Sequence, residues 1–119
     1  MNQKVYIVAY IDQMTNQPKL VAFHDIKEAK KCYVHFYGHH RVFPIYDERV
    51  YHREVEKEPD DVRIVCYTHS NEHLTMHAFD DMESARFYYW YYNDKKYVDR
   101  CYLYNIKVHS SFHSFLESK

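Results

Sequence analysis

A chain of 119 residues with 46% hydrophobic and 28% charged residues is long enough for one hydrophobic core and too hydrophobic for a disordered chain. Its formal net charge of −1 supplies no positive field for a polyanion, so direct nucleic-acid binding is not expected. The three cysteines form no C-x-x-C pair, which favours a reducing compartment, and the N-terminal residues lack the long apolar run of a signal peptide or membrane span. We therefore expect one cytoplasmic domain with no membrane contact.

The first elements predicted along the chain form a β-hairpin. Residues 4–11 combine β-branched and aromatic side chains on both faces, which is typical of a strand covered on two sides. Asn16–Pro18 has the composition of a turn, and residues 19–24 have that of the returning strand.

A helix is predicted next. Asp25 is a suitable N-cap, with Glu28 three residues later as the second half of a capping box. Gly38, the only glycine, is placed to end the helix in a left-handed conformation, and a third strand follows over residues 42–52. The side chains expected to face the core share one helical stripe: Ile26, Ala29, Tyr33 and Phe36.

The second half of the chain shows the same succession of patterns. Strands are predicted over residues 62–69 and 73–79, joined by a turn, followed by a helix over 81–93 and a strand over 99–109. The core stripe of this second helix consists of Met82, Ala85, Tyr89 and Tyr92.

The two halves are similar enough in sequence to predict an internal duplication. Residues 5–10 correspond to 62–67, and residues 22–29 correspond to 78–85. The chain is therefore interpreted as a single pseudo-symmetric domain of repeat one (4–53), a charged linker (54–61), repeat two (62–109) and a tail (110–119). The predicted fold class is α+β: a duplicated β-β-α-β unit with two helices on an antiparallel-rich, six-stranded sheet.

The main candidate for a binding surface is the run of six aromatic residues at positions 87–92. A helix needs only one apolar stripe to dock on a sheet, and Tyr89 and Tyr92 already belong to that stripe. The remaining rings are left for a partner, and aromatic residues dominate protein-binding hot spots. The candidate partner-binding residues are Phe87, Tyr88, Trp90 and Tyr91. The alternative is an enlarged core in which these rings pack against the other repeat.

The ten histidines raise the question of a metal site, chiefly at His69, His73 and His77. They lie on a predicted hairpin whose geometry is compatible with convergence of their side chains, and His39 and His40 form a second pair. No zinc-binding motif is present, however, and exposed strand histidines are common. We therefore expect neither a metal nor another cofactor.

Catalytic and charge-based alternatives have weaker signals. No nucleophile motif, carboxylate-pair spacing or glycine-rich phosphate loop is present, so a non-enzymatic protein is expected. A set of carboxylates in and before the linker suggests a possible acidic patch that imitates a phosphate backbone, although interspersed basic residues favour a solvated linker. These residues are Asp47, Glu48, Glu54, Glu56, Glu58, Asp60 and Asp61.

Residues 4–10, residues 21–25 with Glu28-Ala29, and the Cys32-Tyr33 pair together resemble small β-β-α-β proteins encoded by bacteriophages and prophages of low-GC bacteria. The ending at residues 108–112 resembles the ends of such units. The resemblance implies an anti-defence inhibitor of the anti-CRISPR type, which acts in the cytoplasm of an infected bacterium by binding a host protein such as an RNA-guided nuclease. It carries over no functional residues.

The function expected from the sequence is therefore stoichiometric inhibition of a host protein, such as a nucleic-acid-binding nuclease complex. A homodimer is the other partner considered. A small enzyme or a ligand-sequestering anti-defence protein with an unrecognised site is the alternative. A binder inhibits in proportion to its amount, whereas an enzyme acts far below the concentration of its target.

Overall fold

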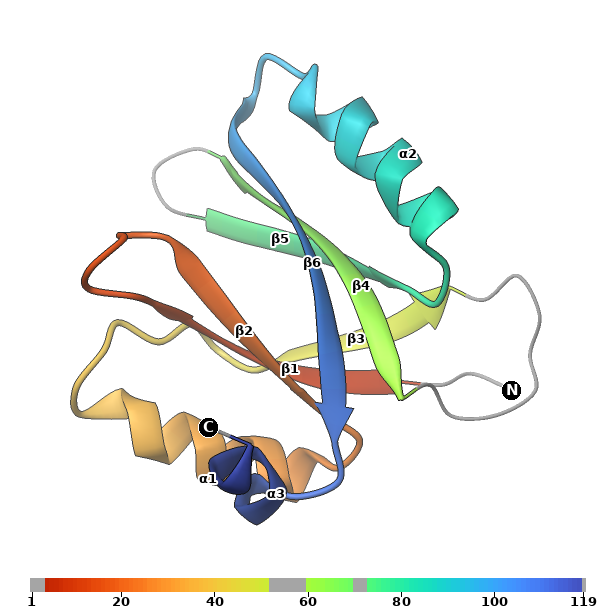
Figure 1. The fold of residues 1–119 in the computed structure, drawn as a ribbon. Coiled ribbons are helices and arrows are strands. Elements are labelled where there is room, and N and C mark those ends of the chain that lie inside the picture. Colours follow the sequence, from red (N-terminus) through yellow and green to blue (C-terminus); the bar gives the residue numbers. More distant parts are fainter. Residues whose placement is uncertain (1–3, 52–59, 70–72, 119) are drawn as a thin grey trace. The chain divides into compact units, whose positions relative to one another are not determined.

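The computed structural model describes residues 4–51, 60–69 and 73–118. Its elements follow the order β-β-α-β twice and end in a short helix, which Figure 1 shows from red to blue. They are β1 (Lys4–Ile11), β2 (Pro18–Phe23), α1 (Ile26–Tyr37), β3 (Tyr46–Tyr51), β4 (Asp61–His69), β5 (His73–Phe79), α2 (Met82–Asn93), β6 (Val98–His109) and α3 (Phe112–Glu117). None of the helices in these described ranges has the length and apolar character needed to cross a membrane.

The predicted α+β class with an antiparallel-rich sheet is wrong. The strands are hydrogen-bonded in the order β1-β2-β6-β4-β5-β3, which closes into a barrel, and the described chain is 47% strand and 29% helix. The reason lies in the last strand of each half. β6 pairs in parallel with β2, and β3 pairs in parallel with β5, so each joins a hairpin from the other half of the sequence. Local patterns identify strands but do not specify such non-local partners.

The residues form two compact units, whose boundaries differ from those of the two sequence halves because of these non-local strand pairs. One comprises residues 4–48 and 107–119, and the other comprises residues 49–106. Each is described below by itself. The boundaries of the sequence repeats stay a prediction.

In the unit of residues 4–48 and 107–119, α1 packs on the β1–β2 hairpin. Asp25 caps the helix as predicted, because its carboxylate accepts a hydrogen bond from the Lys27 N–H at 2.8 Å. Of the predicted stripe, Ala29 and Phe36 are buried and Tyr33 is partly buried, but Ile26 is 39% exposed. Most of the core residues of this unit come from these elements: Val8, Val21, Phe23, Ala29, Cys32, Phe36 and Phe115.

Glu28 does not complete the predicted capping box. Its carboxylate instead accepts a hydrogen bond from the backbone N–H of Phe112 at 2.9 Å and pairs with Lys31 at 2.9 Å. This contact joins α1 to the start of α3, a helix that the sequence did not predict (Figure 1). Phe115 of α3 is buried against Phe36, with ring centroids 6.2 Å apart. The tail is therefore part of the core of this unit.

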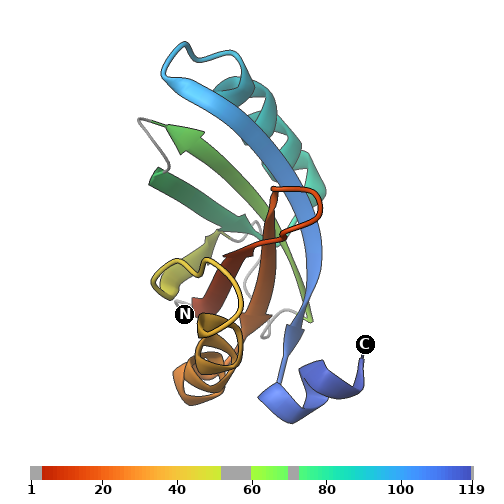
Figure 2. The same cartoon turned by 90° about the vertical axis from the view of Figure 1, so that its left-hand side faces the viewer.

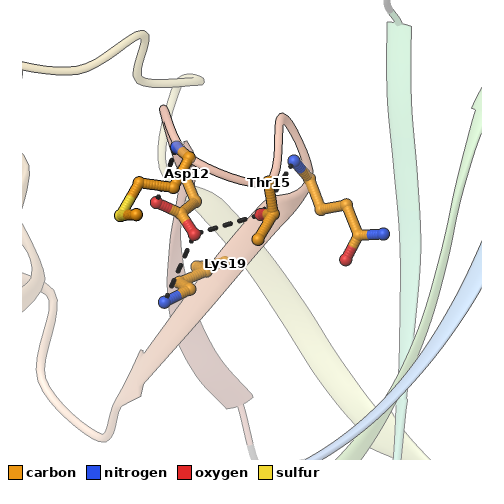
Figure 3. Close-up of polar contacts among 5 residues, drawn as sticks. Asp12, Thr15 and Lys19 are labelled. Atoms are coloured by element: carbon orange, nitrogen blue, oxygen red, sulfur yellow. Dashed lines mark hydrogen bonds and ion pairs between the residues drawn. The ribbon is translucent and has the colours of Figure 1, made fainter.

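The β1–β2 turn is stabilised by Asp12, as Figure 3 shows. Its carboxylate accepts a hydrogen bond from the Thr15 hydroxyl at 3.0 Å and pairs with Lys19 at 3.6 Å. The hydrogen bond from Thr15 is the main reason that the pKa of Asp12 lies below its ordinary value. Asn16 takes the left-handed conformation with φ 57°, which confirms the turn predicted around this residue.

In the unit of residues 49–106, β4 and β5 form an antiparallel hairpin that α2 covers on one face (Figure 2). Asp81 caps α2 by accepting a hydrogen bond from the Ser84 N–H at 2.9 Å. Val65, Phe79 and Ala85 are buried where the helix meets the hairpin. Tyr89 and Tyr92 are partly buried beside them, so the second predicted stripe faces the strands.

The first testable consequence concerns the α1 stripe. Ala29→Glu should destabilise the protein by more than about 3 kcal/mol, because Ala29 has no exposed surface and an unpaired carboxylate would be buried against the hairpin. Val34→Glu on the same helix is the matched control, since Val34 is 71% exposed. Chemical denaturation measures both. Equal effects of the two substitutions would contradict this packing of α1.

A second prediction follows from Gly38, which does not adopt the predicted left-handed conformation. Its φ is −82°, and an added Cβ would meet no atom within 4 Å. Gly38→Ala should therefore raise the free energy of unfolding by about 0.4–1 kcal/mol, because alanine restricts the unfolded chain at no cost to the folded one. Thermal and urea unfolding provide the measurement, and a destabilised variant would disagree with the observed backbone.

Candidate protein-binding surface

The outward side of α2 carries four exposed aromatic side chains, and a further one in this unit, Tyr97, follows the helix and is 54% exposed. Phe87 is 59% exposed, Tyr88 40%, Trp90 73% and Tyr91 43%. We call these four residues the aromatic face. They are the residues proposed from the sequence as a contact surface, and they lie on the outer side and the flank of the helix.

The helical repeat explains why these rings remain outside. Successive residues are rotated by about 100°, so the positions that bury Ala85 and partly bury Tyr89 and Tyr92 cannot also bury Trp90. The small side chain of Ala85 lies fully buried against the hairpin. The helical geometry therefore leaves the other aromatic rings of α2 outside the core.

Contacts at its edges hold three of the four rings of the aromatic face. Tyr88 stacks on Phe79 of β5 with ring centroids 5.0 Å apart, and the rings of Phe87 and Tyr88 are nearly perpendicular with centroids 5.6 Å apart. The ammonium group of Lys95 lies 4.0 Å from the centre of the Tyr91 ring, a cation–π geometry. Rings fixed in this way lose little conformational entropy on binding.

A cluster of tyrosine and histidine rings supports the inner side of the same helix. Tyr92 stacks on Tyr67 at 4.4 Å and lies nearly parallel to His77 at 5.6 Å. The Tyr92 hydroxyl and His77 Nε2 are 3.4 Å apart. Burial raises the pKa of Tyr92 to about 12 and lowers that of His77 below 6.5. Both groups are therefore neutral around pH 7, which suits an uncharged packing layer.

The histidines considered as metal ligands lie near this cluster without forming a ligand set. The rings of His69 and His73 stack across the hairpin at 5.8 Å, and His69 Nε2 is 2.9 Å from the Thr75 hydroxyl. Over residues 4–51, 60–69 and 73–118, no group of three histidine, cysteine or acidic side chains has the geometry of a metal site.

The cysteines lack the environment of a nucleophile. Burial raises the pKa of Cys66 to about 12 and that of Cys101 to about 11, whereas a reactive thiol requires a lowered pKa. Cys32 is fully buried in the core beneath α1.

The residues of the possible acidic patch are not all placed. Glu54, Glu56 and Glu58 lie outside the described residues. The carboxylate of Asp47 is 3.5 Å from the Lys4 ammonium group, and Asp60 and Asp61 are exposed on the other unit.

Glu48, beside Asp47, has its pKa raised to about 7, chiefly by burial and also by the neighbouring charge of Asp47. It therefore carries only part of a negative charge near neutral pH, which makes it a poor substitute for a phosphate.

One further surface feature was not predicted. A shallow apolar groove of about 490 Å³ lies beside α1 and α3, lined by Lys30, Lys31, Val34 and Phe112. The sequence did not indicate it because the groove exists only when α3 docks on α1, through the long-range bond between Glu28 and Phe112.

Comparisons with protein-family models, curated proteins and solved structures found no match. Any proposal for a contact surface therefore depends on the geometry and chemistry of these residues alone.

The His77 environment predicts a pH dependence of stability. Because its folded-state pKa is depressed, its contribution is complete above the ordinary value of about 6.5 and is lost as the pH falls through the lower folded-state pKa. His77→Phe keeps a ring beside Tyr92 and removes the titration. Between about pH 7.5 and pH 5, wild type should lose more free energy of unfolding than this variant in urea titrations. Equal losses would show that protonating His77 costs the fold nothing.

Proposed function

We propose that this chain is a non-enzymatic protein-binding module whose contact surface is the aromatic face of α2. The single observation that carries the proposal is the exposure of four aromatic side chains on one helix, led by Trp90 at 73%. Tyrosine and tryptophan are enriched among the residues that provide most of the energy of protein interfaces.

Two features support binding over catalysis. Tyr88 and Tyr91 of the aromatic face are held by Phe79 and Lys95 before any partner arrives, which lowers the entropic cost of association. The cysteine pKa values are raised, and Glu48, half-buried beside the Asp47 carboxylate, belongs to no group of three metal-binding side chains among the described residues. The alternative of a small enzyme or ligand-sequestering protein has no comparable constellation among the described residues.

For the partner, we propose a protein rather than a nucleic acid, because the chain has a net charge of −1 and no excess of cations. The resemblance to phage-encoded inhibitors adds a bacterial defence protein, such as an RNA-guided nuclease, as the first class of target to test. The comparisons supply no support for a phage origin or for that target.

The test replaces Trp90 and Tyr91 together by alanine. A protein captured with tagged wild type is identified, purified and titrated against both forms by calorimetry. The double variant should weaken binding by at least about 2 kcal/mol, because it removes two exposed rings that would be buried at the interface. Tyr37→Ala is the matched control, since Tyr37 is 68% exposed on α1 and lies outside the aromatic face.

Circular dichroism and the melting temperature establish whether the double variant folds. A folded double variant that binds like wild type would refute the aromatic face as the contact surface. Loss of folding would instead assign the two rings to the core, which also contradicts the proposal.

A further inference from the structure

Charges are distributed unevenly about the aromatic face. Acidic residues precede or begin α2, whereas basic residues follow it: Asp80, Asp81 and Glu83 against Lys95, Lys96 and Arg100. Asp94 and Asp99 reduce the positive charge at the C-terminal end without reversing its sign. At the N-terminal end, Arg86 and Arg63, whose guanidinium donates to the Asp80 carbonyl at 2.8 Å, reduce the negative charge in the same way. The face thus lies between a weakly negative end and a weakly positive end.

This distribution makes the surface self-complementary in one orientation. If two α2 helices pair antiparallel, the acidic end of each lies against the basic end of the other, and their helix dipoles are also opposed. A parallel pairing would place like charges together. We propose that the partner of the aromatic face is a second copy of this chain, bound with α2 antiparallel to α2 about a two-fold axis.

This inference rests on the proposed function, because it names the occupant of the same surface. A two-fold axis makes every contact occur twice, so one favourable charge pair is doubled. In sequence, the aromatic face lies midway between Glu83 and Lys96. An antiparallel pair centred on these rings therefore brings Glu83 of each copy toward Lys96 of the other. Both side chains are exposed.

The size of the surface sets the expected strength of the dimer. An aromatic side chain contributes roughly 200 Å² when fully buried, so the exposed parts of the four rings amount to roughly 450 Å² per copy. Two copies would bury roughly 900 Å² from the rings alone, and the flanking charged side chains would bring the total to about 1,000 Å² or more. That area is at the low end for specific complexes. We therefore expect a weak dimer that dissociates on dilution.

Sedimentation equilibrium of the full chain over a range of concentrations tests the proposal. Wild type should change reversibly from monomer to dimer below about 1 mM, and the Trp90→Ala/Tyr91→Ala variant should remain a monomer. Each single charge reversal, Glu83→Lys or Lys96→Glu, should raise the dimer Kd at least about fivefold at low salt. Lys30→Glu on α1 is the control and should have no effect.

The single and double charge reversals together distinguish the orientations. In an antiparallel pair each single reversal places like charges opposite each other, and the double reversal Glu83→Lys/Lys96→Glu restores opposite charges and should bring the Kd back toward the wild-type value. In a parallel pair each residue faces its own copy, so every one of these variants opposes like charges as wild type does and the Kd should not change. Single reversals without effect, or a double reversal that fails to restore the dimer, would overturn the proposed geometry. These surface substitutions keep the test decisive even if the aromatic variant does not fold.

Two other outcomes separate this inference from the proposed function. Wild type could stay monomeric at about 1 mM but bind a purified heterologous protein that the aromatic variant no longer binds. That result would refute the proposed dimer and would leave the protein-binding role intact. A dimer that persists unchanged in the folded aromatic variant would overturn the pairing of α2 with α2.

Discussion

A helix can bury only one side against a sheet, and this constraint determines the surface of the unit formed by residues 49–106. Ala85 has no exposed surface, and Val65 and Phe79 are buried with it where α2 meets the β4–β5 hairpin. Once that side is chosen, the helical repeat directs Trp90 away from the strands. The exposure of the aromatic face is thus a consequence of how α2 docks.

Helix α1 has the same length as α2, but its outer side is partly covered by another helix. In α1, the position equivalent to Tyr91 is His35, which contacts Phe112 of α3 at a ring separation of 5.3 Å. Among the described residues of the unit formed by 49–106, no helix covers α2 in that way. The two helices share their docking side and their aspartate caps, but the outer side of α2 has rings where α1 has lysine, valine and histidine, and the exposed Tyr88 stands where α1 has the buried Cys32. This difference is what favours a binding role for α2.

Local features of the fold could be predicted because they depend on neighbouring residues. The Asp25 cap follows from side-chain chemistry within one turn, and so does the turn at Asn16. The exposure of Trp90 follows from periodicity in the same way. The closed barrel could not be predicted, because the parallel pairing of Ala22 with Val108 joins positions that no local pattern connects. Glu28 failed as a capping residue for a related reason, since its actual hydrogen-bond donor lies 84 residues away.

We expect Trp90 to be accessible in the free chain and to become covered by a protein partner. Trp90 is the only tryptophan, so intrinsic fluorescence reports on this one position. Iodide quenching should be strong in dilute solution and should fall, with a blue shift of the emission, as the protein concentration rises or a purified partner is added. Emission that is already shielded from iodide in a dilute, monomeric sample, or that stays fully accessible in the bound state, would contradict the account.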